Sequence, residues 1–222
     1  MKYKIDLHTH SIISHDGGIT ADDYEKVLWN GKLNYIAITD HNETRFARIL
    51  HKKLGDKIIV GEEIGTQQGE IIGLFLKETI PGGLTIEETV AAIKHQGGLV
   101  YIPHPYETFR KGVQEASLQQ IKKEISIIEV FNGRGRFRGK ATLASAFANE
   151  NKLAKAASSD AHGVQGLGIT FSWLDEIPTK DNLVKSLTNP TLKTDYAPIY
   201  TFLFPLMNRI KNKIILTGAQ TK

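Results

Sequence analysis

Residues 35–41, Tyr-Ile-Ala-Ile-Thr-Asp-His, contain a short apolar run that ends in a carboxylate and an imidazole. Short apolar runs recur along the chain, and several are continuous, as is typical of strands covered on both faces in a parallel sheet. The other runs lie at residues 57–60, 71–76, 99–102, 125–131 and 153–158. Because helix-like stretches alternate with these runs, we expect an α/β fold, either a parallel barrel or an open sheet.

Two of the expected helices have clear N-terminal signals. Thr20-Ala-Asp-Asp23 and Thr85-Ile-Glu-Glu88 both have the pattern of a capping box, so helices should begin directly after Thr20 and Thr85. Gly97 is expected to end the second helix. The sequence contains no evident internal repeat or linker, and we treat residues 1–222 as a single catalytic domain.

The composition excludes several classes of protein. With 41% hydrophobic and 23% charged residues, the chain is globular rather than disordered or fibrous. The net charge of +4 suits an anionic substrate but is too small to indicate nucleic-acid binding by itself. Cysteine is absent, so a metal would be held by His, Asp and Glu. We expect a cytoplasmic protein, because the sequence has neither an apolar leader nor a membrane-spanning run.

Histidines and carboxylates follow the apolar runs. In parallel α/β folds the carboxyl ends of the strands meet at one crevice, so these side chains should converge. They are Asp6, His8 and His10, then Asp40 and His41, then Glu62 and Glu63, then His104, and finally Asp160 and His162. An isolated His-x-His pair is more often a surface or hydrogen-bonded core feature. Five such clusters favour a metal site, and a ligand set without thiolates suits zinc, manganese, iron or nickel.

The five motifs and their order resemble those of the polymerase and histidinol phosphatase (PHP) family. They lie between residue 1 and about residue 165, which is most of the chain. They are Asp6-Leu-His-Thr-His-Ser11, Ile38-Thr-Asp-His-Asn42, Gly61-Glu-Glu-Ile64, Ile102-Pro-His-Pro105 and Ser159-Asp-Ala-His162. The resemblance implies a distorted (β/α)7 barrel of the PHP type, two or three divalent metal ions at its carboxyl-end face, and hydrolysis of phosphoesters.

The resemblance also implies the metal ligands. They are His8, His10, Asp16, His41, Glu63, Glu70, His104, Asp160 and His162. His15 interrupts the usual Ser-Asp-Gly step, so either Asp16 or His15 could be the early ligand. Glu70 stands where many relatives have a histidine. It is either a ligand that favours manganese over zinc, or a solvated side chain beside a weak or absent third metal.

Within this interpretation, His8, His10, Asp160 and His162 are the expected catalytic groups, acting on a metal-bridged hydroxide. Asp6 and Asp40 are expected to orient imidazoles. The loop of residues 132–139, Asn-Gly-Arg-Gly-Arg-Phe-Arg-Gly, is predicted to clamp the phosphate. Arg134 is the first choice there, with Asn132 and Arg136 as further substrate-binding residues and Arg138, Lys140, Arg110 and Lys111 in reserve. Alternatively the loop is a solvated basic segment or a weak RNA-contacting patch.

Three functions remain open at this point. The leading one is hydrolysis of a phosphomonoester of a nucleotide or another small phosphorylated metabolite with manganese, zinc or iron. An exonuclease or oligonuclease on short RNA or DNA is the alternative, and a non-catalytic, metal-stabilised binding module is the third. Amide hydrolysis by a similar metal cluster also stays open. Residues 195–222 are either a closing helix packed on the barrel or a membrane-surface or partner helix. The oligomeric state is not predicted.

Overall fold

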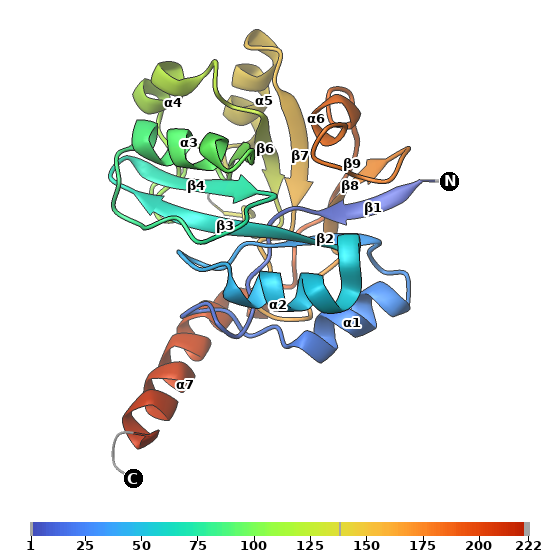
Figure 1. Ribbon diagram of the computed structural model, residues 1–222, viewed down its shortest axis with the longest axis vertical. Helices are drawn as coiled ribbons and strands as arrows, with labels where there is room; N and C mark the ends of the chain where they lie inside the picture. The colour runs from blue at the N-terminus through green and yellow to red at the C-terminus, as the bar shows by residue number, and fades with distance from the viewer. Residues whose placement is uncertain (1, 138, 220–222) are drawn as a thin grey trace.

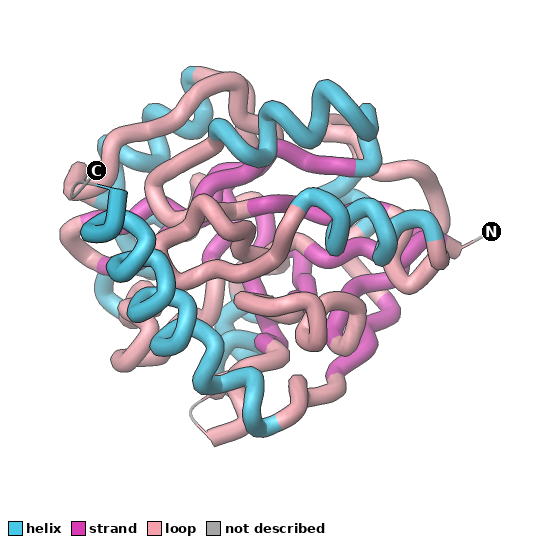
Figure 2. The backbone as a smooth tube through the Cα atoms, turned by 90° about the horizontal axis from the view of Figure 1, so that it is seen from below, coloured by secondary structure: helices cyan, strands magenta, loops and turns pink. Residues whose placement is uncertain are grey.

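The computed structural model describes residues 2–137 and 139–219. In this part of the chain, nine strands form one curled sheet, with helices and loops around it (Figures 1 and 2). The strands are β1 (Tyr3–Asp6), β2 (Tyr35–Ile38), β3 (Ile58–Thr66), β4 (Gly69–Leu74), β5 (Leu99–Ile102), β6 (Ile127–Asn132), β7 (Ala154–Ser158), β8 (Thr170–Leu174) and β9 (Thr191–Thr194). The α-helices are α1 (Ala21–Trp29), α2 (Arg45–Leu54), α3 (Ile86–His95), α4 (Glu115–Ile121), α5 (Ala141–Glu150), α6 (Leu183–Ser186) and α7 (Phe204–Ala219), with 3-10 turns η1 (Gly55–Lys57) and η2 (Ile199–Leu203).

The sheet closes into a barrel at the carboxyl ends of its strands. Its order is β7-β6-β5-β4-β3-β2-β1-β8-β9, and the segments that follow β1 and β7 meet. The backbone N–H of Asp160 donates to the carbonyl of His8 at 2.9 Å, and that of His10 donates to the carbonyl of Ala161 at 2.9 Å. Motifs that are 150 residues apart in the sequence therefore become neighbours through backbone pairing.

The prediction of a distorted α/β barrel is confirmed, but two details of it are wrong. The sheet has nine strands among the described residues rather than the seven that the resemblance implies, because β8 and β9 extend it antiparallel from β1. In addition, β4 runs antiparallel to both β3 and β5. Only residues 67–68 connect β3 to β4, and a parallel crossover needs about a dozen residues or more.

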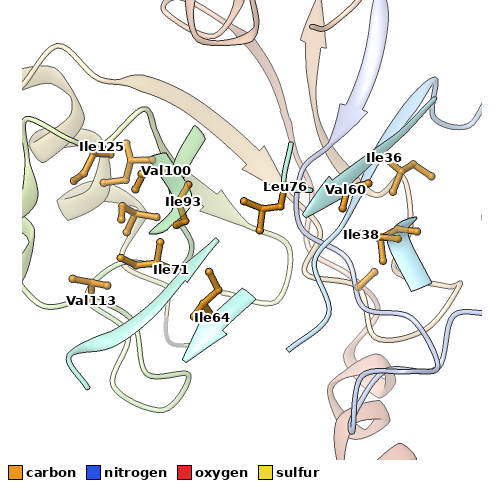
Figure 3. Packing of buried hydrophobic residues seen from close by; sticks show 14 of the residues in the cluster. Ile36, Ile38, Val60, Ile64, Ile71, Leu76, Ile93, Val100, Val113 and Ile125 are labelled. Carbon is orange, nitrogen blue, oxygen red and sulfur yellow. The ribbon is translucent and has the colours of Figure 1, made fainter. Parts of the chain in front are cut away.

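The core has two layers. Ile36 and Ile38 of β2 belong to a cluster that also contains helix residues such as Ile93 (Figure 3). The alternate residues Tyr35 and Ala37 belong to a second cluster. Because successive side chains of a strand point to opposite faces, both faces of the sheet are buried, as the continuous apolar runs indicated. Burying each large aliphatic side chain stabilises the fold by about 1.5–3 kcal/mol.

Both predicted capping boxes are present. The hydroxyl of Thr20 accepts from the backbone N–H of Asp23 at 3.2 Å, and the Asp23 carboxylate accepts from the backbone N–H of Thr20 at 3.0 Å. The same reciprocal pair opens α3 at Thr85. Gly97 follows that helix with φ +74°, a conformation that favours glycine. These local signals were sufficient to fix the start of two helices.

The C-terminal helix α7 extends away from the body of the molecule (Figure 1). Its first turns are attached by Asn208, whose amide donates to the carbonyls of Asp16 at 2.9 Å and His162 at 3.0 Å. The apolar side chains of Leu206, Met207 and Ile210 are exposed. The predicted closing segment, residues 195–222, lies partly outside the described residues, and its role stays a prediction. No described helix combines the length and apolar character needed to cross a membrane.

Candidate metal centre

All nine side chains predicted as metal ligands converge at the carboxyl-end face of the barrel. His41 and Glu70 are half-buried, and the other seven are buried. Each of the four groups that follows has ligand atoms within 4.8 Å of one another. The groups are His8, His10 and Glu63; His8, His104 and Asp160; Glu63, Glu70 and His104; and His10, Asp16, His41 and His162.

The centre of the cluster is the pair of imidazoles from the Asp-Leu-His-Thr-His motif. The Nε2 atoms of His8 and His10 are 3.1 Å apart. Glu63 Oε2 is 3.4 Å from the first of these nitrogens and 3.3 Å from the second. A proton can bridge only one pair of these atoms, whereas a cation is shared by all of them, with ligand bonds of about 2.0–2.2 Å. The residues present therefore fit a divalent metal ion.

Two further groups flank this pair. Glu63 also reaches His104, with 3.0 Å between Oε1 and Nε2, so its carboxylate spans two positions. On the other side, Asp16 lies 3.6 Å from His41 Nε2 and 3.4 Å from His162 Nε2. The ligand groups thus adjoin one another, and Glu63 belongs to two of them.

The structure answers two questions that the sequence left open, namely whether Asp16 or His15 faces the cluster and where Glu70 points. Asp16 faces the imidazoles of His41 and His162, whereas the side chain of His15 is 59% exposed at the rim. The Glu70 side chain is only 13% exposed and its oxygens lie 3.9 Å from His41 and 3.8 Å from His104. Glu70 is therefore directed into the cluster and not into solvent.

The pKa shifts of the clustered side chains are consistent with a site that binds cations. Burial would lower the pKa of His41, but Glu63 and Asp16 outweigh it and raise that pKa to about 9. Burial, together with the neighbouring His10 and Arg134, lowers the pKa of His162 to about 3, which leaves this imidazole neutral and able to ligate. Burial and the neighbouring Glu63 carboxylate raise the pKa of Glu70 to about 7. Carboxylates crowded in this way repel one another until cations neutralise them.

Two of the predicted ligands have strained backbone conformations. His104 has φ 29° and Asp160 has φ 53°, and neither is a glycine. Such conformations cost of order 1–3 kcal/mol each and persist where the surroundings impose them. The backbone N–H of His104 donates to Glu129 Oε2 at 2.7 Å, and that of Asp160 is held by the carbonyl of His8. These hydrogen bonds hold both residues in conformations that they would otherwise rarely adopt.

Sequence reasoning missed Glu129, which organises the floor of the site. This buried carboxylate accepts hydrogen bonds from His8 Nδ1 at 3.2 Å, the Tyr101 hydroxyl at 2.9 Å and Asn132 Nδ2 at 2.8 Å, besides the backbone of His104. By accepting a hydrogen bond from His8 Nδ1–H, it leaves the unprotonated Nε2 free for a metal. The available signal was a single glutamate inside the apolar run of residues 125–131.

Asp6 and Asp40 are buried, as expected, but they do not orient imidazoles directly. The Asp40 carboxylate accepts from the backbone N–H and the hydroxyl of Ser11, each at 2.6 Å. Asp6 Oδ1 accepts from the backbone N–H of Ser159 at 3.0 Å, and burial raises the pKa of Asp6 to about 7. The prediction was wrong because both groups hold the backbone of the ligand-bearing loops.

The predicted phosphate clamp is only partly at the site. Arg134 reaches it, with Nη1 3.4 Å from Asp160 Oδ1 and 3.1 Å from His162 Nδ1. Arg110, one of the reserve residues, donates to Asp160 and to Asn132 Oδ1. Asn132 therefore lies beneath the arginines and positions them rather than facing the cavity.

The other basic residues of the loop are placed differently. The guanidinium of Arg136 lies over the ring of Tyr196, 5.0 Å from its centroid. Arg136 does not line the cavity formed by the predicted metal ligands or the larger cavity next to it. Lys140 is exposed, and Arg138 lies outside the described residues. A cavity of about 170 Å³ is lined by seven of the nine predicted ligands, all except His8 and His10, together with Arg110, Lys111 and Arg134.

Comparison with known proteins adds relatives in sequence and in fold. No protein-family model matches the sequence. The chain is 35% identical over 207 residues to the uncharacterized protein MJ0417 of Methanocaldococcus jannaschii, covering 86% of this chain and 82% of that protein. It is 38% identical over 146 residues to MJ1587 of the same organism, covering 60% and 84%.

Solved structures resemble the whole described architecture. A two-domain protein from Bacteroides vulgatus, which contains a predicted PHP-like metal-dependent phosphoesterase, matches with a TM-score of 0.69 and 20% identity over 88% of this chain. This chain spans 65% of the length of that protein. PsfC from Pseudomonas syringae matches with a TM-score of 0.66 and 17% identity, covering 96% and 99%. The lesion-specific endonuclease EndoQ from Pyrococcus furiosus matches with a TM-score of 0.62 and 16% identity, covering 86% and 58%. At these identities the comparisons establish a shared fold.

Proposed function

The chain belongs to one family with the uncharacterized protein MJ0417 and has the fold of PHP-like metal-dependent phosphoesterases, and from this premise we propose that it is a metal-dependent hydrolase of phosphoesters. The finer proposal is a phosphomonoesterase acting on a nucleotide or another small phosphorylated metabolite. The observation that carries it is the convergence of nine histidine and carboxylate side chains in one cluster, seven of which line a cavity together with three arginines.

Two or three divalent cations, such as manganese, zinc or iron, would be held by the ligand groups described above. When bound, such ions lower the pKa of a water molecule toward about 7 and neutralise the oxygens of the phosphate. His8, His10, Glu63 and Asp160 would form the central position, with His104 and Glu70 on one side. Asp16, His41 and His162 would form the other side.

The remaining residues would bind and orient the substrate. Arg134 and Arg110 line the cavity, and guanidinium groups are suited to the non-reacting oxygens of a phosphate. Arg134 Nε is buried and has no hydrogen-bond partner among the described residues, so the hydrogen-bonding capacity of this guanidinium is not fully used. Glu129 would keep the His8 proton on Nδ1, away from the reacting face.

A nuclease acting on short oligonucleotides is the second candidate. Endonuclease Q in complex with a 27-mer duplex that has an abasic lesion at its active site shares the fold, with a TM-score of 0.61 and 14% identity. Exposed aromatic side chains, Phe109 and Phe137, stand close to the cavity and would suit stacked bases.

The test is phosphate release after metal stripping and reloading with manganese, zinc or iron(II). The substrates are ribose 5-phosphate, AMP, 3′,5′-bisphosphoadenosine and a short oligonucleotide. Metal-dependent release that His8→Ala and Asp160→Asn abolish supports the proposal. The exposed Asp175→Asn serves as the matched control and should retain activity. Stoichiometric metal binding without turnover of any phosphoester would overturn the proposal in favour of a metal-stabilised binding module.

A further inference from the structure

A second and larger cavity adjoins the metal centre. It has a volume of about 550 Å³, within the range of about 300–1,000 Å³ common for small-molecule sites. The cavity of the metal ligands, at about 170 Å³, is much smaller. The two share one wall, formed by Phe109, Arg110, Arg134, Pro205 and Arg209. A molecule larger than a phosphate group that reaches the metal centre would therefore extend into the second cavity.

The walls of the larger cavity are aromatic and aliphatic. Phe109 comes from the loop after β5, Phe137 from the loop after β6, and Phe202 from η2. Phe109 is 72% exposed and Phe137 is 67% exposed, and the rings of Phe137 and Phe202 are 5.9 Å apart between centroids. Three separate segments thus direct phenylalanines to one exposed hollow, and contiguous exposed apolar surface of this kind is typical of a binding site.

The charges lie at the junction of the two cavities. Arg110, Arg134 and Arg209 belong to the shared wall, and Arg209 also donates to Asp16 Oδ2 at 3.1 Å. Glu107, the carboxylate of the larger cavity, is already paired with Arg110. The arrangement therefore suits a ligand with an anionic end at the junction and a flat apolar end among the phenylalanines.

We propose that the larger cavity, here called the base pocket, binds the base of a nucleoside phosphate whose phosphate group lies at the metal centre. The inference rests on the proposed function and names its substrate class. Bases stack on aromatic side chains whatever their sequence, and one such contact changes affinity by about 5- to 150-fold. A sugar phosphate without a base would leave the phenylalanine side chains exposed to water, so they would not increase its affinity.

Residues of the C-terminal segment form part of the base pocket. Residues Ile199, Phe202, Pro205, Leu206 and Arg209 form its outer wall. Asn208, between these residues, is bonded to the carbonyls of Asp16 and His162, both of which are ligand candidates. The wall that contacts the base is therefore attached directly to the loops that hold the metal ions.

The experiment compares ligands that differ only by the base. Binding of adenosine and of ribose to the metal-loaded protein is measured by calorimetry, because neither has a phosphate to be hydrolysed. In parallel, kcat/KM is measured for AMP and for ribose 5-phosphate. Phe202→Ala and Phe137→Ala are compared with Leu203→Ala, which removes an exposed apolar side chain next to the pocket that does not line it.

The expected result is that adenosine binds at least about 10-fold more tightly than ribose and that each phenylalanine variant removes most of this difference. The same variants should lower kcat/KM for AMP and leave kcat/KM for ribose 5-phosphate unchanged. The control Leu203→Ala should change neither value. Equal binding of adenosine and ribose would overturn the base pocket, and so would an unchanged adenosine affinity in both phenylalanine variants. Adenosine binding that these variants weaken, without hydrolysis of any phosphoester, would support the pocket and overturn the proposed reaction instead.

Discussion

Glu129→Gln is the substitution that most directly tests how the site is organised. The parent carboxylate accepts four hydrogen bonds, two at each oxygen. On one side the donors are the backbone N–H of His104 and the amide of Asn132, and the backbone donor cannot change its role. On the other side the donors are His8 Nδ1 and the Tyr101 hydroxyl, which are both able to accept instead.

The glutamine amide nitrogen should therefore face His8 and Tyr101. It would donate to His8 Nδ1 and drive the imidazole proton onto Nε2, the atom that faces His10 and Glu63. Substitution of such a partner costs about 10- to 100-fold in metal affinity. The free energy of unfolding should decrease by at most about 2 kcal/mol, because four hydrogen bonds remain possible and a buried charge is removed.

The assay is competition with a chromophoric chelator for manganese and zinc, together with urea unfolding of the metal-free protein. Nitrogen-detected NMR of the imidazoles reports the tautomer of His8 directly. Glu124→Gln, a surface change of the same chemistry, is the matched control and should behave as the parent. Parent-like metal affinity in Glu129→Gln, or a His8 proton still on Nδ1, would refute the reasoning.

Three further outcomes follow from the same geometry. Arg134→Ala should raise KM for phosphorylated substrates about 10-fold at unchanged metal content, measured by steady-state kinetics and elemental analysis, and unchanged kinetics would remove Arg134 from the clamp. Burial raises the pKa of Glu62 to about 8, so the folded state holds this proton more tightly than the unfolded state and stability falls as pH rises from about 4.5 to 8. Glu62→Gln should remove that loss, worth about 5 kcal/mol above pH 8 in urea unfolding, whereas an equal pH dependence in both proteins would contradict it. Chelation of the metal ions should lower the melting temperature by several degrees in calorimetry, since the predicted ligands join the segments that follow β1 and β7. An unchanged melting temperature would show that metal binding and folding are not coupled.

The arrangement of the ligands explains why closure of the barrel and assembly of the site are one event. His8 and Asp160 are connected by backbone hydrogen bonding, and their side chains lie on the same central position. A change that loosens the pairing between the segments after β1 and β7 would separate these ligands. Stability and metal affinity are therefore expected to decrease together for substitutions at this seam.

The candidate ligands could be predicted from the sequence because their spacing is local. His8 and His10 share a face through the period of an extended strand, and polar residues directly after apolar runs must lie at the end of the sheet. The capping boxes at Thr20 and Thr85 are equally local, since each involves residues three positions apart. For such features the covalent spacing already defines the geometry.

The other features of the site depend on contacts between segments that are distant in the sequence. Glu129 is recognisable as the support of His8 only when residues 121 positions apart are brought together. Arg110 reaches the site and Arg136 does not, although both follow strands, because Tyr196 of a later segment takes the guanidinium of Arg136. The base pocket likewise needs three loops and the start of α7. These contacts depend on how the sheet curls, and no pattern within one segment determines that curvature.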